Sequence, residues 1–242
     1  MNEFELIERF FTRQIADPDV LLGVGDDGAV VRPAAGRDLV IVADTMVEGV
    51  HFPRGMDAAD IAFRAVAVNL SDIAAMAARP RWMTLALTLA EPDADWLEKF
   101  AVGLFEIGSE FDVTLIGGDT TGGSQTVITV QIIGDVEPGN AISRSGARSG
   151  DEIYVTGTPG DAACGFELWQ SGAVQGDAAK ELYRRFARPE ARVQFSSGLA
   201  AFASAAIDVS DGLFADIEKL LVASAVGGRI DIDSLPLSAS LV

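Results

Sequence analysis

The stretch Asp57–Pro80, DAADIAFRAVAVNLSDIAAMAARP, is the centre from which the fold is predicted. Residues 58–78 are expected to form a helix, because Asp57 can act as its N-cap and Pro80 lies just beyond its end. Apolar runs flank this helix. Leu39–Val42 predicts a strand that is buried on both faces, and residues 82–89 predict another strand. Strands on both sides of a helix indicate a mixed α/β (α+β) fold.

The first part of the chain contains further alternating elements. Phe4, Ile7, Phe11 and Ile15 recur at three- and four-residue spacing, which predicts an opening helix. Beyond residue 89, the sequence predicts a helix over 94–111 and a strand over 113–116. Residues 126–133 alternate polar and β-branched side chains, as is typical of a half-exposed strand.

The amino-acid composition changes near residue 140, because residues 138–140 and 145–150 are rich in turn-forming residues. We therefore predict two domains, 1–140 and 141–242. The second is expected to contain strands at 152–156, 206–209 and 228–232 and helices at 161–171, 177–187, 191–204 and from 213. Because little follows the last predicted strand, we expect this second domain to be incomplete.

The charge balance excludes one class of partner. Among 242 residues, 36 acidic side chains outnumber 18 basic ones, and the formal net charge is -18. A surface this acidic repels a phosphate backbone, so no nucleic acid partner is expected. The single cysteine excludes an internal disulfide framework, and no apolar run reaches the roughly 18 residues that span a bilayer. Since the acidic start is also unlike a signal peptide, we predict a cytoplasmic protein with no membrane partner.

Acidic residues recur beside glycines where predicted strands give way to loops. Five such motifs occur: Gly25-Asp26-Asp27-Gly28, Ala43-Asp44-Thr45, Ser71-Asp72, Gly117-Gly118-Asp119-Thr120 and Asp208-Val209-Ser210-Asp211-Gly212. Strand ends are where open α/β sheets gather ligands, and Mg²⁺ prefers carboxylate oxygens. Each motif alone is also explained by a turn or a helix cap. All five on one chain favour a divalent-metal site that works with substrate phosphates.

Phosphate binding by a Walker loop is excluded, because the sequence contains no such motif. None of the three lysines, Lys99, Lys180 and Lys219, lies in a glycine-rich loop. Phosphate chemistry must therefore rest on metal ions, backbone amides and arginine. Arg144 is the best-placed arginine, because it lies in the turn-rich segment between the predicted domains. Its alternative is a solvated surface charge.

His51 is the only histidine and follows Asp44 by seven residues. No Gly-x-Ser-x-Gly elbow follows a predicted strand, which disfavours a serine hydrolase. Two interpretations of His51 stay open, namely a hydrogen bond to a substrate phosphate and a packed structural role. Cys164 lies in a predicted helix and is interpreted as a core residue.

Seven segments together resemble one known family. They are GVGDDGAV (23–30), DTMVEGVHF (44–52), AVNLSDIAAM (67–76), LIGGDTT (115–121), SRSGA (143–147), YVTGTPGD (154–161) and IDVSDGL (207–213). The chain resembles the thiamine-monophosphate kinase family of the aminoimidazole ribonucleotide synthetase-like superfamily, from the first helix to about residue 236. NLSDIAAM and GGDTT are specific to the superfamily, whereas EGVHF and YVTGTPG point to the kinases within it.

The resemblance implies a two-domain, synthetase-like architecture. Its N-terminal domain of sheet and helices binds ATP and Mg²⁺ and pairs with a second copy through the sheet, and its C-terminal domain is α/β. The implied activity is ATP-dependent phosphorylation of thiamine monophosphate to thiamine diphosphate. By motif match, several Mg²⁺ ions would be held by Asp27, Asp44, Asp72, Asp119, Asp208 and Asp211. ATP would contact Gly118, Asp119, Arg144 and Ser210, and His51 would contact the thiamine phosphate.

Two features depart from the family pattern. Val42 and Ala43 stand where the family commonly has hydroxyl residues before the matched Asp44, so one metal position loses side-chain ligands. A later Ser-Gly-Gly-Glu-Asp-Tyr-Glu-like segment of the family and its C-terminal substrate-binding aromatic residue have no counterpart in this sequence. Two alternatives to the kinase stay open from sequence. One is another ATP-using synthetase of the superfamily, and the other is a non-catalytic acidic protein or inactive fragment that binds divalent cations.

Overall fold

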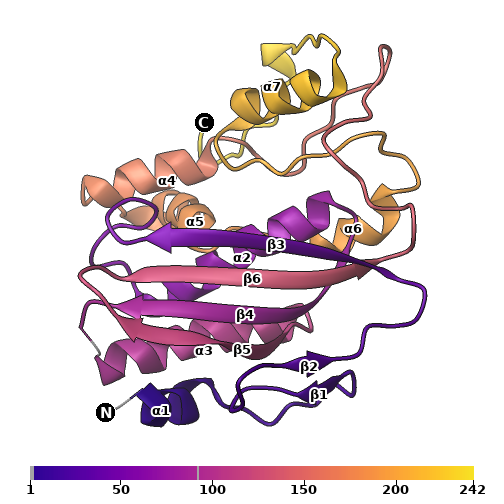
Figure 1. Cartoon of the computed structure of the whole chain (residues 1–242). Coiled ribbons are helices and arrows are strands. Elements are labelled where there is room, and N and C mark those ends of the chain that lie inside the picture. Colours follow the sequence, from indigo (N-terminus) through magenta and orange to yellow (C-terminus); the bar gives the residue numbers. More distant parts are fainter. Residues whose placement is uncertain (1–2, 92) are drawn as a thin grey trace.

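The computed structural model describes residues 3–91 and 93–242, and it is organised around a four-stranded sheet (Figure 1). Its strands are β3 (Asp38–Val47), β4 (Arg79–Leu89), β5 (Thr114–Gly122) and β6 (Val127–Val136), in the order β3-β6-β4-β5. β6 is antiparallel to both of its neighbours, whereas β4 and β5 are parallel. The predicted mixed α/β fold is confirmed.

Two helices, α2 (Ala58–Ala75) and α3 (Ala94–Glu110), cover one face of this sheet (Figure 1). The predicted N-cap of α2 is confirmed, because Asp57 accepts a hydrogen bond of 2.9 Å from the Ala59 N–H. The helices approach closely at Gly103, where a Cβ atom would lie 2.0 Å from the Ala59 carbonyl oxygen. Small residues therefore set the spacing between the two helices.

The two faces of the sheet differ in burial. Val130 and Leu85 lie opposite each other on the face under the helices, and both are buried. On the other face, Leu39 and Ile41 of the edge strand β3 are 44% and 59% exposed. The prediction that residues 39–42 are buried on both faces is therefore wrong. The reason is that the helices cover only one face of this largely antiparallel sheet.

The N-terminal segment packs at the β5 side of the molecule (Figure 1). It contains α1 (Glu3–Leu6), the short π-helix η1 (Ile7–Phe11) and the short hairpin strands β1 (Val20–Leu22) and β2 (Val30–Val31). The predicted opening helix thus ends at Phe11. Arg81 of β4 ties the following segment to the sheet, since its guanidinium pairs with Asp19 at 2.7 Å and with Asp135 at 3.1 Å.

The C-terminal part consists of helices and extended segments. Its helices are α4 (Asp161–Gln170), α5 (Gly176–Ala187), α6 (Val193–Leu199), α7 (Leu213–Ser224) and the 3₁₀ turn η2 (Ile232–Ser234). Arg188, which follows α5, pairs with Asp60 of α2 at 2.5 Å and with Glu106 of α3 at 2.7 Å. Arg64 of α2 donates a hydrogen bond to the Phe186 carbonyl. These contacts hold α5 against the helices that cover the sheet.

The strands predicted for the C-terminal part are wrong. Within residues 141–242, the segments 152–156, 206–209 and 228–232 form no strand. An apolar β-branched run becomes a strand only where a partner completes its hydrogen bonds. Ala206, for example, makes a backbone hydrogen bond of 3.1 Å to the Ser143 carbonyl, but no ladder follows. The helix predicted over 191–204 is also shorter, because α6 ends at Leu199.

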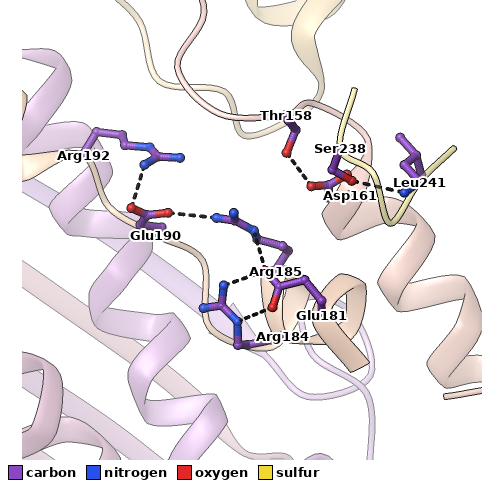
Figure 2. Close-up of polar contacts among 9 residues, drawn as sticks. All are labelled: Thr158, Asp161, Glu181, Arg184, Arg185, Glu190, Arg192, Ser238 and Leu241. Carbon is purple, nitrogen blue, oxygen red and sulfur yellow. Dashed lines mark hydrogen bonds and ion pairs between the residues drawn. The ribbon is translucent and has the colours of Figure 1, made fainter. Parts of the chain in front are cut away.

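Polar networks join the C-terminal helices to their loops (Figure 2). Glu190 pairs with Arg185 at 2.8 Å and with Arg192 at 2.6 Å. Asp161, at the start of α4, accepts hydrogen bonds from Thr158 and from Ser238, the latter at 2.7 Å. These contacts order the glycine-rich loop before α4 and the last residues of the chain.

The helices that the structure describes were also compared with the length and hydropathy of a membrane span. Among residues 3–91 and 93–242, none of them meets both requirements.

Candidate active site

An open cavity of about 410 Å³ lies between the edge strand β3, the C-terminal half of α2 and two extended segments. It brings together parts of the chain that are far apart in sequence. Its walls are formed by Val42, Ala43, Asp72, Ala75, Met76, Ile142, Ser143, Arg144, Ala206, Ile207 and Asp208. Three of the predicted site residues, Asp72, Arg144 and Asp208, therefore share one cavity.

The carboxylates at this cavity repel one another. The pKa of Asp72 is raised to about 7, mainly by burial and in addition by the charges of Asp208 and Asp44. Burial also raises the pKa of Asp208, to which the charges of Asp216 and Asp44 add. Asp44 belongs to this group because it pairs with the buried Val130 and so points to the helix-covered face of the sheet.

This set of donors suits a divalent cation. Carboxylate oxygens are the hard ligands that Mg²⁺ prefers, and a cation would offset the charge repulsion that adds to burial in raising the pKa of Asp72. No three His, Cys, Asp or Glu side chains among the described residues are close enough to form a metal site by themselves. Asp44, Asp72 and Asp208 could therefore hold a divalent cation only together with further oxygen ligands.

Arg144 is placed by a loop that is fastened at several points. The Ser224 hydroxyl, at the end of α7, donates to the Arg144 carbonyl at 2.9 Å and accepts from the Gly146 N–H at 3.2 Å. The Ile142 N–H donates to the Met76 carbonyl at the end of α2. The positive charge of Arg144 opposes the rise in the pKa of Asp72 and of Asp208. Its position is consistent with binding an anion next to the carboxylates.

The loop Asp208–Gly212 leads into α7. Asp208 lines the cavity, whereas Asp211 is exposed and forms an ion pair with Lys219 at 2.5 Å. The backbone N–H groups of Ser210, Asp211 and Gly212 all point to the carboxylate of Asp216. Ser210 and Asp211 are therefore presented by a loop whose backbone is already fixed.

Asp119 and Gly118 lie elsewhere. The segment 117–120 was predicted to follow a strand, but it forms part of β5. Asp119 pairs with the exposed Ala86 and so points to the open face of the sheet, away from the helices. β5 is separated from β3 by β4 and β6, which corresponds to roughly 14 Å at about 4.8 Å per strand. One chain cannot bring Asp119 and Asp44 to the same ion.

Gly118 has a structural explanation within the sheet. A Cβ atom at this position would lie 1.8 Å from the Leu85 carbonyl oxygen of β4. A side chain there is sterically excluded by the neighbouring strand, so strand packing by itself requires a glycine.

Asp27 is also separate from the cavity. It lies in the loop between β1 and β2, and the hairpin lies on the β5 side of the sheet, opposite the edge strand β3 (Figure 1). The Asp27 N–H donates to the Asp26 carboxylate at 2.8 Å, so Asp26 acts as the turn acceptor. Asp27 itself is exposed.

His51 lies in the turn after β3. Its Nδ1 accepts a hydrogen bond of 3.0 Å from the Val47 N–H. In the neutral imidazole, the proton is then on Nε2, which is available as a donor. The side chain is exposed, so the packed structural role that sequence left open is disfavoured. Cys164, interpreted as a core residue, is only half-buried in α4.

The structure therefore gathers half of the predicted carboxylates. Asp44, Asp72 and Asp208 lie within electrostatic range of one another, and Asp27, Asp119 and Asp211 occupy three other places. Val42 and Ala43 form part of the cavity wall, where they offer no side-chain oxygen.

Sequence reasoning missed four residues that support the site: Ser71, Asp216, Lys219 and Ser224. Ser71 forms a hydrogen bond with the Asp208 side chain, and the others fix the loops that carry the predicted residues. The three-residue spacing of Asp216 and Lys219 on a predicted helix could have indicated an ion pair. Nothing in the sequence marks Ser71 or Ser224 as contacts of distant loops.

Comparison with known proteins gives a consistent result. The family described as AIR synthase related protein, N-terminal domain, matches residues 25–136. A curated relative, thiamine-monophosphate kinase of Escherichia coli K12, is 47% identical over 99% of this chain and 74% of its own length. The chain spans a similar share, 76%, of the Bacillus subtilis thiamine-monophosphate kinase, to which it is 35% identical.

Solved structures agree with the sequence relatives. A thiamine-monophosphate kinase from Stenotrophomonas maltophilia K279a has a TM-score of 0.90 and 46% identity, covering 98% of this chain and 77% of that one. AaThiL complexed with AMPPCP and TMP has a TM-score of 0.82 and 32% identity, covering 89% of this chain and 69% of that one. High identity along almost the whole chain, together with the same fold, shows that this chain belongs to the thiamine-monophosphate kinase family.

Proposed function

We propose that this chain transfers the γ-phosphoryl group of ATP to thiamine monophosphate and so forms thiamine diphosphate. The observation that carries this proposal is its 47% identity to the Escherichia coli kinase over 99% of its own length. A relative of the same fold was solved with AMPPCP and TMP, which have the chemistry of the two substrates. The other synthetases of the superfamily and a non-catalytic cation-binding protein are less well supported.

The direct test is an incubation of the chain with ATP, Mg²⁺ and thiamine monophosphate, followed by chromatography of the products. We expect thiamine diphosphate and ADP in equal amounts. Parallel reactions with no acceptor, with selenide and with a formylglycinamidine ribonucleotide test the other superfamily activities. ATP consumption with one of these acceptors, or none with thiamine monophosphate, would contradict the proposal.

The acceptor needs little activation. A phosphate monoester has a second pKa of about 6, so it is mostly dianionic near neutral pH and is already a nucleophile. The obstacle is repulsion by the triphosphate, because two unit charges about 4 Å apart cost about 4 kcal/mol at an effective dielectric constant near 20. Because the acceptor is already dianionic, no general base is required, and we propose direct in-line transfer without a phosphorylated enzyme.

Asp44, Asp72 and Asp208 are the side chains that would hold Mg²⁺ at the cavity. Bound Mg²⁺ supplies neutralisation of the phosphate charges and keeps the reacting oxygens in line. Around it, Arg144 and Ser210 bind the nucleotide, and Asp211 lies at the surface of the same loop. The mutual repulsion of the carboxylates supports this assignment, because it is strongest where a cation would relieve it.

The exposed Nε2–H of His51 is proposed to donate to the phosphate of thiamine monophosphate. A hydrogen bond to a charged group contributes about 1.5–3 kcal/mol, so His51→Ala should raise the KM for thiamine monophosphate about 10- to 100-fold. The KM for ATP should stay unchanged. His51→Gln, which retains a donor at a similar reach, should recover part of the loss in steady-state kinetics. Equal effects on both KM values would refute this role.

The open face of the sheet is proposed to pair with a second copy. Leu39 and Ile41 expose apolar area there, and the rest of the face carries small or polar side chains such as Ala43, Thr45 and Thr129. A face of this kind is self-complementary under a two-fold axis. Asp119 lies on the same face, and Asp27 lies at its β5 side.

Such a pair would complete the site. Asp119 cannot reach Asp44 of its own chain, but a second sheet packed on the open face could bring Asp119 and Asp27 of the other copy to the cavity at β3. We therefore propose that each active site takes Asp44, Asp72 and Asp208 from one copy and Asp27 and Asp119 from the other. This arrangement accounts for Asp27 and Asp119, which are two of the three predicted ligands that are absent from the cavity of one chain.

Ile41→Glu should convert the protein to a monomer and abolish turnover, because it places a charge on the apolar part of the proposed interface. Light scattering during size-exclusion chromatography measures the mass directly. Val102→Glu is the matched control, since Val102 is 60% exposed on α3 and its substitution should change neither mass nor rate. A monomeric wild-type chain with full activity would exclude the interface.

Two further proposals concern organisation and location. The domain boundary is placed near residue 140, supported by the end of the sheet at Val136 and by the family match that ends at the same residue. A cytoplasmic location is supported by the free Cys164, which suits a reducing compartment.

A further inference from the structure

Three backbone amides converge on one buried carboxylate oxygen at the start of α7. The N–H groups of Ser210, Asp211 and Gly212 donate to Oδ2 of Asp216 at 2.8, 3.0 and 3.2 Å. The Asp216 side chain is 1% exposed. A buried carboxylate is costly unless hydrogen bonds or an opposite charge compensate for its lost hydration, and the three amides provide part of this compensation.

The second carboxylate oxygen is occupied as well. Oδ1 of Asp216 accepts a hydrogen bond of 2.7 Å from Nζ of Lys219, one turn further along α7. Burial alone would raise the pKa of Asp216, but Lys219 and the backbone amides outweigh it, and the pKa lies below its usual value. All the partners of Asp216 thus favour its charged form.

Asp216 serves the loop rather than only the helix. Gly212, the residue before α7, offers no side-chain cap, and its φ of 120° lies in a region that favours glycine. The carboxylate of Asp216 instead reaches back over the helix start and holds residues 210–212 together. The same Lys219 that neutralises Asp216 also pairs with Asp211, so backbone and side chain of the loop are fixed from one point.

We propose that Asp216 is a positioning residue, which holds the backbone of residues 210–212 in the shape that presents Ser210 to ATP next to Asp208 of the cavity. Lys219 assists Asp216, because its ammonium group pairs with the carboxylates of both Asp216 and Asp211. This inference rests on the proposed function, since it assumes that the loop binds the nucleotide. Asp216 itself need not touch ATP, because its carboxylate oxygens are taken up by the loop and by Lys219.

The test compares Asp216→Asn with Glu218→Gln. Glu218 is exposed on the same helix and its substitution also removes one negative charge, so it is a matched control. The dissociation constant of AMPPCP is measured by calorimetry in saturating Mg²⁺. Removal of a group that orients ligands typically costs 10- to 100-fold in affinity, and we expect about this weakening for Asp216→Asn and less than twofold for Glu218→Gln.

Hydrogen exchange separates positioning from general damage. In the wild type, the amides of residues 210–212 should exchange slowly, and in Asp216→Asn they should exchange faster while the amides of β4 and β6 keep their protection. Affinity for AMPPCP equal to that of Glu218→Gln would overturn the proposal. So would unprotected 210–212 amides in the wild type, or a folded Asp216→Asn variant in which these amides lose no more protection than the rest of the chain.

Lys219→Met provides a second route if Asp216→Asn does not fold. This substitution leaves the three hydrogen bonds from the backbone amides to Asp216 in place but releases Asp211. We therefore expect weaker AMPPCP binding, while the amides of residues 210–212 keep their normal protection from hydrogen exchange. Unchanged AMPPCP binding by Lys219→Met would refute the role of Lys219. If the amides of residues 210–212 are also unprotected in the wild type, the role of Asp216 is refuted as well. Because binding is measured without turnover, a wild type that binds AMPPCP but does not phosphorylate thiamine monophosphate contradicts only the proposed function.

Discussion

Asp72→Asn is expected to reduce turnover by about 10²–10³-fold or more while the protein stays folded. Asp72 lies at the centre of the carboxylate group, since both Asp44 and Asp208 act on its pKa. Loss of one metal ligand removes several kcal/mol of charge stabilisation in the transition state, and about 1.4 kcal/mol corresponds to a factor of ten. The rate of thiamine diphosphate formation at saturating ATP and Mg²⁺ measures this loss.

The same substitution should stabilise the ion-free protein. The folded state raises the pKa of Asp72 from 3.8 to about 7, so it binds this proton more tightly than the unfolded chain does. The free energy of unfolding therefore falls as the pH rises from about 4 to about 7, and the loss is complete above pH 7. Asparagine carries no charge at any pH. In EDTA at pH 8, Asp72→Asn should melt at a higher temperature than the wild type, and the difference should shrink at pH 4.

Glu98→Gln, which removes an exposed carboxylate from α3, is the control for both effects and should change neither rate nor melting temperature. Added Mg²⁺ should raise the melting temperature of the wild type and have little effect on Asp72→Asn, because ligands that bind only the folded state stabilise it. An active Asp72→Asn variant would exclude the cavity as the metal site. If Asp72→Asn melts at a lower temperature than the wild type in EDTA, burial and the neighbouring charges do not destabilise the ionised Asp72 carboxylate.

Mixing two inactive variants should restore activity if each site is built from two copies. Asp72→Asn and Asp119→Asn should each be inactive alone. After subunit exchange at equal amounts, half of the dimers are mixed, and each mixed dimer has one intact site out of two. About a quarter of the wild-type rate is then expected, as follows from the two-fold symmetry of a dimer.

The control mixture combines Asp72→Asn with Asp44→Asn. Both residues belong to the same cavity, so every site in the mixed dimer has one damaged cluster and no activity should return. Mass spectrometry under native conditions confirms that exchange has taken place. If exchange is complete and the first mixture stays inactive, Asp72 and Asp119 do not act across the interface, and the proposed shared site is wrong.

Helices were the most reliable prediction from sequence. The range 58–78 corresponds to α2 and 94–111 to α3, because their caps and apolar spacing are local features that no distant contact overrides. In the C-terminal part, α4, α5 and α7 were predicted, whereas the three strands were not formed. A strand depends on a partner elsewhere in the chain, and an apolar run such as 206–209 carries no information on whether that partner is present.

For the site, the residue types and their motifs could be read from the sequence, as could the family to which they belong. The face of the sheet on which each side chain lies could not. Asp44 and Asp119 look equivalent as acidic residues next to predicted strand ends, yet strand register places Asp44 under the helices and Asp119 on the open face. A shift of one residue would exchange these faces, because side chains alternate along a strand.

The sequence by itself determined the acidic character of this protein and the lack of a Walker loop, and from these it predicted that carboxylates bind phosphates through cations. Only the tertiary structure decided which carboxylates meet, because their distances depend on strand order and on the packing of α2 and the 206–208 segment against β3. It also revealed Asp216 as the anchor of a site loop, since three converging amides are a property of folded backbone and leave no trace in residue type.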